Sequence, residues 1–417
     1  MTGADRDILA RTRAQFGAAP PARLGVAVSG GGDSVALLHI LSRCFEPGAV
    51  EVAAVTVDHG LRPQSAREAE EVGELAERLE IAHTTLRWTG WDGTGNLQAR
   101  ARDARYRLIG EWAKTLEISV VAFGHTADDQ AETVLMGLAR SSGVNGLSAM
   151  PVRRTLHGIN LLRPLLGATR QELRDYLRGH DIAWSEDPSN EDDRFDRVKV
   201  REALKLLAPI GLTAQVLSDV AGNMAQAREA LDWFGFLSAR DLAVVDGGDV
   251  SMDLRRFRTL PAEIARRLLT RAILWVGGQD QVLRRVPVSQ ALDAARQGRA
   301  ITLGGCHVLS HGNRIWVCRE FNAVRHERSG PQEIWDRRWR LDGPCEAGVE
   351  IRPLGRKGVS DCPDWRLTGR PLSSVIASPA IWKDDELLAA PLAGRPEGWK
   401  VRLTGGEEEF FASLLSH

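Results

Sequence analysis

The segment Ser29-Gly-Gly-Gly-Asp-Ser34 combines residue types that bind phosphate groups. It separates an apolar run, Leu24 to Val28, from a helical pattern that begins at Ser34. The glycines allow backbone N–H groups to approach an anion closely, and the start of a helix adds about half a positive charge. Asp33 could orient the phosphates or bind Mg²⁺. An ordinary glycine-rich turn between a strand and a helix is the alternative.

Two commoner phosphate-binding motifs are absent from this segment. It does not contain G-x-x-x-x-G-K-[ST], and the first lysine of the chain is Lys114. The pattern G-x-G-x-x-G is also incomplete, because Val35 stands at the third glycine position. The remaining pattern, S-G-G-x-D-S, resembles the pyrophosphatase-type loop of enzymes that cleave ATP between its α- and β-phosphates.

A second group of chemically capable residues lies in Gly124-His-Thr-Ala-Asp-Asp-Gln-Ala-Glu132. Its members are spaced at i, i+3, i+4 and i+7, which predicts one helix face carrying His125, Asp128, Asp129 and Glu132. Three carboxylates so close together repel one another unless they bind a cation, such as an ammonium substrate or Mg²⁺. Helix capping by Thr126 and Asp129 is the alternative, but it does not explain Glu132.

A third segment, Asn96 to Tyr106, reads as a helix with arginines at positions 100, 102 and 105. Arginine can bind a phosphate, or the charge that develops at phosphorus, through its forked guanidinium. Taken alone, the pattern is also typical of a solvated basic helix face.

These groups require a scaffold, and the first ~125 residues alternate strands with helices. This alternation predicts an α/β fold with a Rossmann-like parallel sheet, in which ligands bind beyond the carboxyl ends of the strands. We expect strands at 24–28, 50–57, 83–88 and 119–123, and helices at 34–44, 65–79 and 97–116. A further helix is expected at about 198–207.

The remainder of the chain predicts a mostly helical region from 212 to 296, including a helix at 254–275. A hairpin or meander at 301–319 and a small α+β unit with strands at 349–353 and 386–391 follow. We therefore expect a catalytic domain at residues 1–208, a helical domain at 209–325 and a small C-terminal domain at 326–417.

Composition bounds the class of protein. The chain has 417 residues, 43% hydrophobic and 26% charged residues, and a net charge of −1, all typical of a globular protein. No apolar run is long enough for a bilayer crossing and no signal peptide is visible, so we expect a cytoplasmic protein without membrane contact. Five cysteines without a C-x-x-C pair argue against a disulfide framework or a zinc site. Arginines concentrate at 151–180 and 251–300, which indicates either a surface that follows phosphates or solvated helix faces.

Several motifs in a fixed order resemble the tRNA(Ile)-lysidine synthases over roughly residues 20–205. They are the ATP loop, Val57-Asp-His-Gly-Leu-Arg-Pro63, Gly95-Asn-Leu-Gln-Ala99, Gly124 to Glu132, Gly146-Leu-Ser-Ala-Met150, Leu162-Arg-Pro-Leu-Leu166 and Glu186-Asp-Pro-Ser-Asn190. Phe195 and Arg197 continue the family pattern, but Val198 replaces an asparagine. The resemblance to the later domains is weaker.

The resemblance implies an adenine nucleotide α-hydrolase-like fold and a two-step reaction. The wobble cytidine of the CAU anticodon of isoleucine tRNA is first adenylated by ATP, and free lysine then displaces AMP. It implies ATP and Mg²⁺ as cofactors, with Asp33 as the Mg²⁺ ligand, and it leaves a homodimer open. The implied ATP-binding residues are Ser29, Gly30, Gly31, Gly32, Asp33, Ser34, Asp58 and His59. The implied catalytic residues are Asp33, Arg105, His125, Asp129 and Glu132, with lysine bound by Asp128, Asp129 and Glu132. The expected tRNA-binding residues are Arg197, Arg201, Arg266, Arg267 and Arg271.

Two other functions remain open at this point. A tRNA thiolase uses a similar ATP loop, but sulfur delivery generally needs a reactive cysteine, and only Cys44 lies in the expected catalytic domain. A non-catalytic RNA- or nucleotide-binding protein would use the arginines but would not need Asp33 or the acidic helix face.

Overall fold

The computed structural model describes residues 3–60, 64–89, 97–186, 196–278, 283–344 and 347–415. Parts of three motifs, at 61–63, 95–96 and 187–195, lie outside the described residues. The chain divides into two compact units, residues 1–228 and 229–417. The finer division into three domains stays a prediction.

In the described part of unit 1, six strands form one sheet in the order β3-β2-β1-β4-β6-β5. All neighbours pair in parallel except β5 and β6, which form an antiparallel hairpin. The strands are β1 (Arg23–Ala27), β2 (Glu51–Asp58), β3 (Ala82–Arg87), β4 (Val120–Phe123), β5 (Arg153–Leu156) and β6 (Ile159–Leu162). The four strands expected from the sequence are confirmed, each within about one residue.

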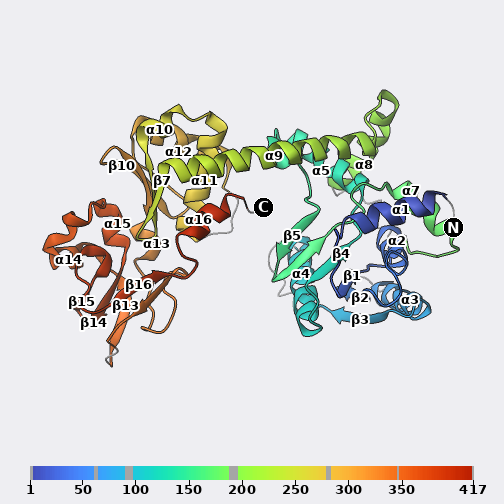
Figure 1. The fold of residues 1–417 in the computed structure, drawn as a ribbon, viewed down its shortest axis with the longest axis horizontal. Coiled ribbons are helices and arrows are strands. Elements are labelled where there is room, and N and C mark those ends of the chain that lie inside the picture. The colour runs from blue at the N-terminus through green and yellow to red at the C-terminus, as the bar shows by residue number, and fades with distance from the viewer. Residues whose placement is uncertain are drawn as a thin grey trace. The chain divides into compact units, whose positions relative to one another are not determined.

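The helices of unit 1 cover both faces of this sheet. They are α1 (Gly3–Ala14), α2 (Gly32–Leu41), α3 (Gln64–Arg78), α4 (Leu97–Thr115), α5 (Ala127–Ala139), α6 (Val144–Leu147), α7 (Arg170–Gly179) and α8 (Asp196–Leu207). One apolar core packs α1, α2, α3 and α7 against the sheet, and a second packs α4 against it through Tyr106, Ile109 and Trp112. Figure 1 shows α4 on the opposite side of the sheet from α1 and α2. The predicted α/β sheet is therefore confirmed.

The order of the strands decides where a ligand can bind. From β1 the chain runs to β2 and β3 on one side, and then crosses to β4 and β6 on the other. In doubly wound sheets, ligands bind at such a switch, beyond the carboxyl ends of the strands that flank it, here β1 and β4. The loop after β1 and the segment after β4 are the two that the sequence marked for phosphate and amine chemistry.

Helix α9 (Ala214–Leu242) contains the boundary between the units, and the short 3-10 helix η2 (Ala208–Ile210) precedes it. Unit 2 begins with an antiparallel sheet in the order β7-β8-β11-β10-β9, packed against α11 and α12 through one apolar core. Its elements are β7 (Ala243–Asp246), β8 (Asp249–Asp253), α10 (Leu254–Thr259), α11 (Ala262–Gly277), α12 (Arg285–Gln297), β9 (Ile301–Leu303), β10 (Cys306–His311) and β11 (Arg314–Arg319). The meander expected at 301–319 is confirmed.

One expectation for this region was wrong and one was incomplete. The region 212–296 is mostly helical, as expected, but it also contains a hairpin of β7 and β8 around Gly247 and Gly248, both with positive φ, which was not predicted. The single helix expected at 254–275 is broken at Pro261, because proline disfavours helical backbone in the residue before it.

The rest of unit 2 contains a three-stranded antiparallel sheet, β13-β14-β15, and the pair β12-β16. The elements are α13 (Phe321–Val324), β12 (Trp339–Asp342), β13 (Val349–Pro353), α14 (Gly355–Ser360), η3 (Pro363–Thr368), α15 (Leu372–Ala377), β14 (Pro379–Lys383), β15 (Glu386–Ala389), η4 (Pro391–Ala393), β16 (Lys400–Leu403) and α16 (Glu408–Ser413). The strand predicted at 349–353 is confirmed. Within the described ranges, no single helix has the length and apolar composition of a membrane span, although α8 and α9 meet these criteria jointly across a 98° bend.

Candidate active site

The loop between β1 and α2 has the conformation of an anion cradle. Gly30 adopts a φ of +83°, a region that favours glycine, and Gly31 is the extended N-cap of α2 without a side-chain capping bond. The Ser34 hydroxyl lies inside the loop, where it accepts from the Ser29 N–H at 3.0 Å and donates to the Gly31 carbonyl at 2.9 Å. Ser34 therefore shapes the loop, and the positive end of α2 lies directly after it.

Two other segments press against this loop. A Cβ atom on Gly124 would lie 2.9 Å from the Asp33 carbonyl oxygen, so only glycine fits at the end of β4. A Cβ atom on Gly32 would lie 3.3 Å from the Trp184 ring, and the Ser185 N–H donates to the Gly30 carbonyl at 3.0 Å. The loop is thus held in shape from both sides by backbone contacts.

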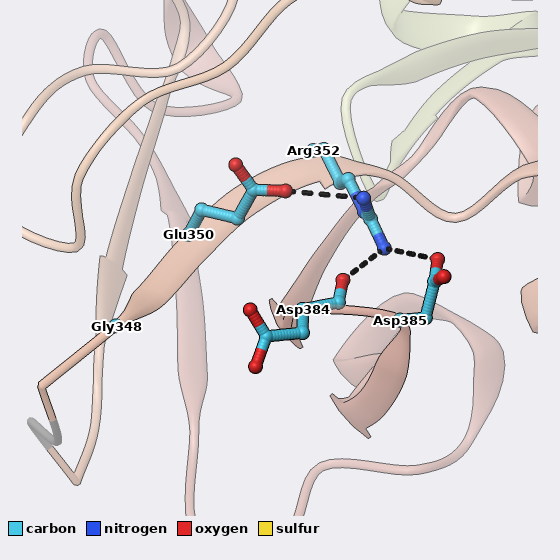
Figure 2. A pocket seen from close by; sticks show the side chains of 5 residues that line it. All are labelled: Gly348, Glu350, Arg352, Asp384 and Asp385. Carbon is cyan, nitrogen blue, oxygen red and sulfur yellow. Dashed lines mark hydrogen bonds and ion pairs between the residues drawn. The ribbon is translucent and has the colours of Figure 1, made fainter.

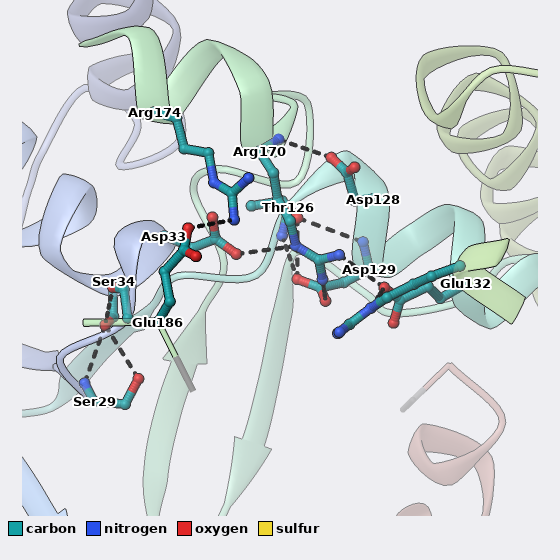
Figure 3. A network of polar contacts seen from close by, with 12 residues as sticks. Ser29, Asp33, Ser34, Thr126, Asp128, Asp129, Glu132, Arg170, Arg174 and Glu186 are labelled. Atoms are coloured by element: carbon teal, nitrogen blue, oxygen red, sulfur yellow. Dashed lines mark hydrogen bonds and ion pairs between the residues drawn. The ribbon is translucent and has the colours of Figure 1, made fainter. Parts of the chain in front are cut away.

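Three acidic residues of the site surround one guanidinium, that of Arg170 at the start of α7, and a fourth contacts the backbone of the same residue. Arg170 donates from Nε to Asp33 at 3.2 Å, from Nη1 to Glu132 at 2.8 Å and from Nη2 to Asp129 at 2.5 Å. Its backbone N–H donates to Asp128 at 2.7 Å. Figure 3 shows the Arg170 side chain pointing from α7 into the space between the loop and α5. The loop and the acidic residues of α5 therefore form one network.

Each acid has a distinct environment. Glu132 is almost fully buried and accepts from both Arg170 and the Arg201 Nε, the latter at 2.7 Å, through the same oxygen. Its second oxygen, Oε2, is buried without a hydrogen-bond partner in the described structure. Asp129 accepts from the N–H and hydroxyl of Thr126 and completes the capping box of α5. The capping alternative is therefore confirmed for Asp129, in addition to its contact with Arg170.

The position of His125 differs from the sequence expectation. Because Thr126 is the N-cap of α5, His125 precedes the helix and does not belong to its acidic face. Burial lowers the pKa of His125 to about 4, so the ring is neutral near pH 7. Its Nδ1 atom is buried without a partner in the described structure. A neutral imidazole can exchange hydrogen bonds with a substrate but does not supply a positive charge.

Burial and the ion pairs set the other protonation states. Burial raises the pKa of Asp33 to about 6, although Arg170 opposes the shift. For Asp129, burial acts in the same direction, but Arg170, His125 and Thr126 together hold its pKa below the usual value. For Arg170, burial is outweighed by Asp129 and Glu132, which raise its pKa. The guanidinium therefore remains charged and is bound mainly by the acids of α5.

Asp58 and His59, which the resemblance assigns to ATP binding, lie at the carboxyl end of β2, where His59 contacts Arg105. His59 Nε2 accepts from Arg105, with the Nη2 atom at 3.1 Å. Asp58 accepts from the Gly60 N–H at 2.9 Å and from the Ser65 hydroxyl at 2.6 Å, and these bonds lower its pKa. The structure thus brings Arg105 to His59, and Asp58 shapes the turn through its carboxylate.

The predicted tRNA-binding arginines fall into different environments. Arg197 is exposed on α8, whereas Arg201 on the same helix contacts Glu132 in the site. On α11, Arg266 is half-buried beside Glu263, and burial lowers the pKa of the half-buried Arg271. Arg267 is only 7% exposed and is paired with Asp232 and Glu263. A guanidinium so enclosed stabilises unit 2 and is not presented to a phosphate.

Sequence reasoning missed the role of Arg170, which it counted among the arginines of residues 151–180, as part of either a surface that follows phosphates or a solvated helix face. Two signals point to it in hindsight. Four carboxylates at one edge of the sheet require a cation, and α7 follows β6, another strand whose carboxyl end lies at that edge. Thr169 also marks the start of α7, since its hydroxyl accepts from the Glu172 N–H.

Two further features bear on the choice of site. Cys44 donates to the Leu9 carbonyl, and burial raises its pKa to about 12, so it is a poor nucleophile for sulfur delivery. A hollow of about 400 Å³ in unit 2 contains Arg352 between Glu350 and Asp385 (Figure 2). Its charges pair with one another, and it contains neither a glycine-rich loop nor a helix N-terminus for a nucleotide.

Asp33 has the chemistry of a Mg²⁺ ligand but not a complete metal site. Among the described residues, no group of three or more His, Cys, Asp or Glu side chains is arranged to bind a metal ion. Mg²⁺ commonly binds proteins through one or two carboxylates together with substrate phosphates. Asp33 fits this role because it lies on the phosphate loop, where a nucleotide would supply the other oxygens.

A doubly wound sheet with this loop at its switch point defines an ATP-using protein of the PP-loop class, and residues 6–207 match the PP-loop domain family. The chain is 56% identical to the tRNA(Ile)-lysidine synthase of Ruegeria pomeroyi over the whole of both chains. It is 33% identical to that of Wolbachia pipientis over 88% of each chain, and 40% identical to that of Rhodopseudomonas palustris over 76% of this chain and 97% of the relative. The chain belongs to the tRNA(Ile)-lysidine synthase family.

Proposed function

We propose that this protein uses ATP to join free lysine to C2 of the wobble cytidine in the CAU anticodon of isoleucine tRNA. The proposal rests on a contact that joins the phosphate loop to the acidic helix. Asp33 of the phosphate loop and Glu132 of the acidic helix contact the same guanidinium. The groups proposed for nucleotide cleavage and for amine attack are therefore neighbours. A relative that matches over the full length of both chains is named tRNA(Ile)-lysidine synthase.

In the first step, the cytidine O2 atom attacks the α-phosphate of ATP, an O–P bond forms, and pyrophosphate leaves. The backbone amides of the loop and the start of α2 stabilise the negative charge of the phosphates. Asp33 would bind Mg²⁺, which neutralises phosphate charge when bound. Arg105, which contacts His59 after β2, would supply a second positive charge to the phosphates.

In the second step, the lysine amine attacks C2, the C–N bond forms, and the C2–O2 bond breaks with AMP as the leaving group. The amine must first lose a proton, because free lysine has a pKa of about 10.4. Glu132 Oε2 is suited to accept that proton, since it is buried and has no partner in the described structure. Asp129 is committed to the helix cap and to Arg170, so it supports lysine binding by charge.

The reaction is tested by incubating the protein with ATP, radiolabelled lysine and a transcript of the isoleucine tRNA with a CAU anticodon. After nuclease digestion, the label is expected in one modified nucleoside, with one AMP and one pyrophosphate per lysine. Consumption of ATP without labelled nucleoside would exclude lysine as the acceptor. The reaction belongs in the cytoplasm, where these three substrates occur together.

Two variants assign the steps. Asp33→Asn is expected to abolish pyrophosphate release, because it removes the loop carboxylate. Glu132→Gln is expected to release pyrophosphate but to accumulate adenylated tRNA, with lysine transfer slowed about 100-fold. Glu111→Gln, a change at an exposed ion pair of α4, is the control and is expected to leave both steps unchanged. Normal lysine transfer by Glu132→Gln would remove Glu132 from the second step.

A further inference from the structure

The guanidinium of Arg170 lies where the proposed amino-acid substrate would place its ammonium group. Three carboxylates, those of Asp33, Asp129 and Glu132, accept its three kinds of side-chain N–H donor. The side chain is 22% exposed, so it is largely enclosed by these acids (Figure 3). In the protein without a nucleotide, these three carboxylates are therefore already paired with a cation, the guanidinium of Arg170.

A second cation cannot enter the same space without a cost. Two positive charges that share the same carboxylates repel one another, and this repulsion weakens the binding of the second. An ammonium group would have to share Asp129 and Glu132 with the guanidinium. Lysine therefore binds well only after Arg170 has moved away from these acids.

A nucleotide phosphate offers Arg170 an alternative partner. Guanidinium groups bind phosphates in a forked geometry that lysine's ammonium cannot match. Arg170 Nε already contacts Asp33, which belongs to the phosphate loop, so phosphates that bind the loop arrive beside it. The long side chain extends from the first residue of α7 and can turn without unwinding the helix.

We propose that Arg170 occupies the lysine site in the free protein and transfers to a nucleotide phosphate when ATP binds, which opens the site to lysine. This inference rests on the proposed function. In this arrangement the nucleotide binds before the amino acid, and Arg170 excludes other amines from the acidic site until ATP is bound. Arg170 is thus a positioning residue that couples the two binding events.

The coupling is measured by the affinity of radiolabelled lysine, by equilibrium dialysis, with and without α,β-methylene-ATP, which cannot be cleaved between its α- and β-phosphates. In the wild-type protein, we expect the analogue to tighten lysine binding at least about ten-fold. In Arg170→Gln, lysine binding without the analogue is expected to tighten about ten-fold, and the analogue should then change it less than about two-fold. Arg178→Gln removes an exposed arginine from the same helix and should retain the wild-type coupling.

Three results would overturn the inference: no effect of the analogue on the wild type, wild-type coupling in Arg170→Gln, or loss of all lysine binding in a folded Arg170→Gln protein. The last result would make Arg170 a permanent part of the lysine site. Thermal unfolding and analogue binding establish that the variant is folded. If it is not, Arg170→Lys serves instead. It retains a cation, so lysine binding without the analogue should stay as weak as in the wild type, and a ten-fold tightening would contradict the inference.

The proposed function and this inference can fail separately. Coupling that disappears in Arg170→Gln, together with no lysidine product in the wild type, would retain the inference and reject the reaction. Lysidine formation without any coupling would retain the reaction and reject the role of Arg170.

Discussion

Replacing Gly124 by alanine tests whether the end of β4 sets the shape of the phosphate loop. The added Cβ atom would lie 2.9 Å from the Asp33 carbonyl oxygen and 3.0 Å from both the Asp33 carbonyl carbon and the Ser34 Cα atom. All three are backbone atoms, so no side-chain rotation relieves the overlap. Carbon atoms in contact prefer separations of about 3.5–4.0 Å, so the loop or the strand must move by roughly 0.5 Å.

The size of the effect follows from this displacement. Overpacking of this kind costs about 1–3 kcal/mol. For a unit of this size, 2 kcal/mol lowers the Tm by roughly 4–8 °C. Misplacement of a catalytic group by about 1 Å costs about 100-fold in rate, so a half-ångström shift of Asp33 should reduce pyrophosphate release at least several-fold.

The assay compares Gly124→Ala with Gly179→Ala. A Cβ atom on Gly179, the last residue of α7, meets nothing within 4 Å, so this variant should retain the wild-type Tm and rate. Pyrophosphate release is followed with ATP and the tRNA transcript, and thermal unfolding is recorded on the same preparations. Wild-type values for both quantities in Gly124→Ala would refute the argument that this close contact shapes the loop.

Two further predictions concern stability. His39 is buried beside Tyr176. Burial lowers its pKa to about 4, and the nearby His180 and Arg43 act in the same direction. In the unfolded chain the histidine has a pKa near 6.5, so it takes up a proton at a higher pH than in the folded protein. The contribution of neutral His39 to the free energy of unfolding is therefore complete above pH 6.5 and is lost towards pH 4, by up to about 3 kcal/mol. Urea unfolding at pH 7 and pH 5 measures this loss, and His39→Gln should make it smaller. An equal loss in the variant and the wild type would contradict the prediction. Arg267→Met should destabilise unit 2 by about 3 kcal/mol because it removes a largely buried guanidinium from its ion pairs with Asp232 and Glu263, whereas Arg255→Gln, at an exposed arginine, should not. Equal unfolding curves would return Arg267 to the predicted tRNA-binding surface.

The scaffold of the site was predictable because its strands and helices carry local signals. Buried parallel strands are short apolar runs, and here glycines or turns bound them, so β1 to β4 were located from composition and spacing. The hairpin of β7 and β8 was missed although Asp246-Gly-Gly-Asp249 is a turn signal. Both strands directly adjoin helices, α9 on one side and α10 on the other, so the helical pattern around them hid the hairpin.

The chemistry of the site was predictable only in part, because partners far apart in the sequence leave no periodic signal. The acids of α5 were found from their spacing, and the cap at Thr126 was recognised as an alternative. A cap at Thr126 implies that His125 precedes the helix, but the sequence analysis placed His125 on the helix face. Neither the pairing of Arg170 with Asp33 nor the burial of Arg267 against Asp232 could be read from local sequence, since each joins residues on different elements.

The strand order explains why one arginine can join the two halves of the site. The phosphate loop follows β1, the acidic helix α5 follows β4, and Arg170 begins the helix that follows β6. These three strands are consecutive neighbours in the sheet and run parallel, so their carboxyl ends deliver all three segments to one edge. A guanidinium reaching inward from the third segment meets the acids of the first two. The contact between the phosphate loop and the acidic helix is therefore a consequence of the topology, and any change that moves β4 relative to β1, as alanine at Gly124 should, acts on both halves of the site together.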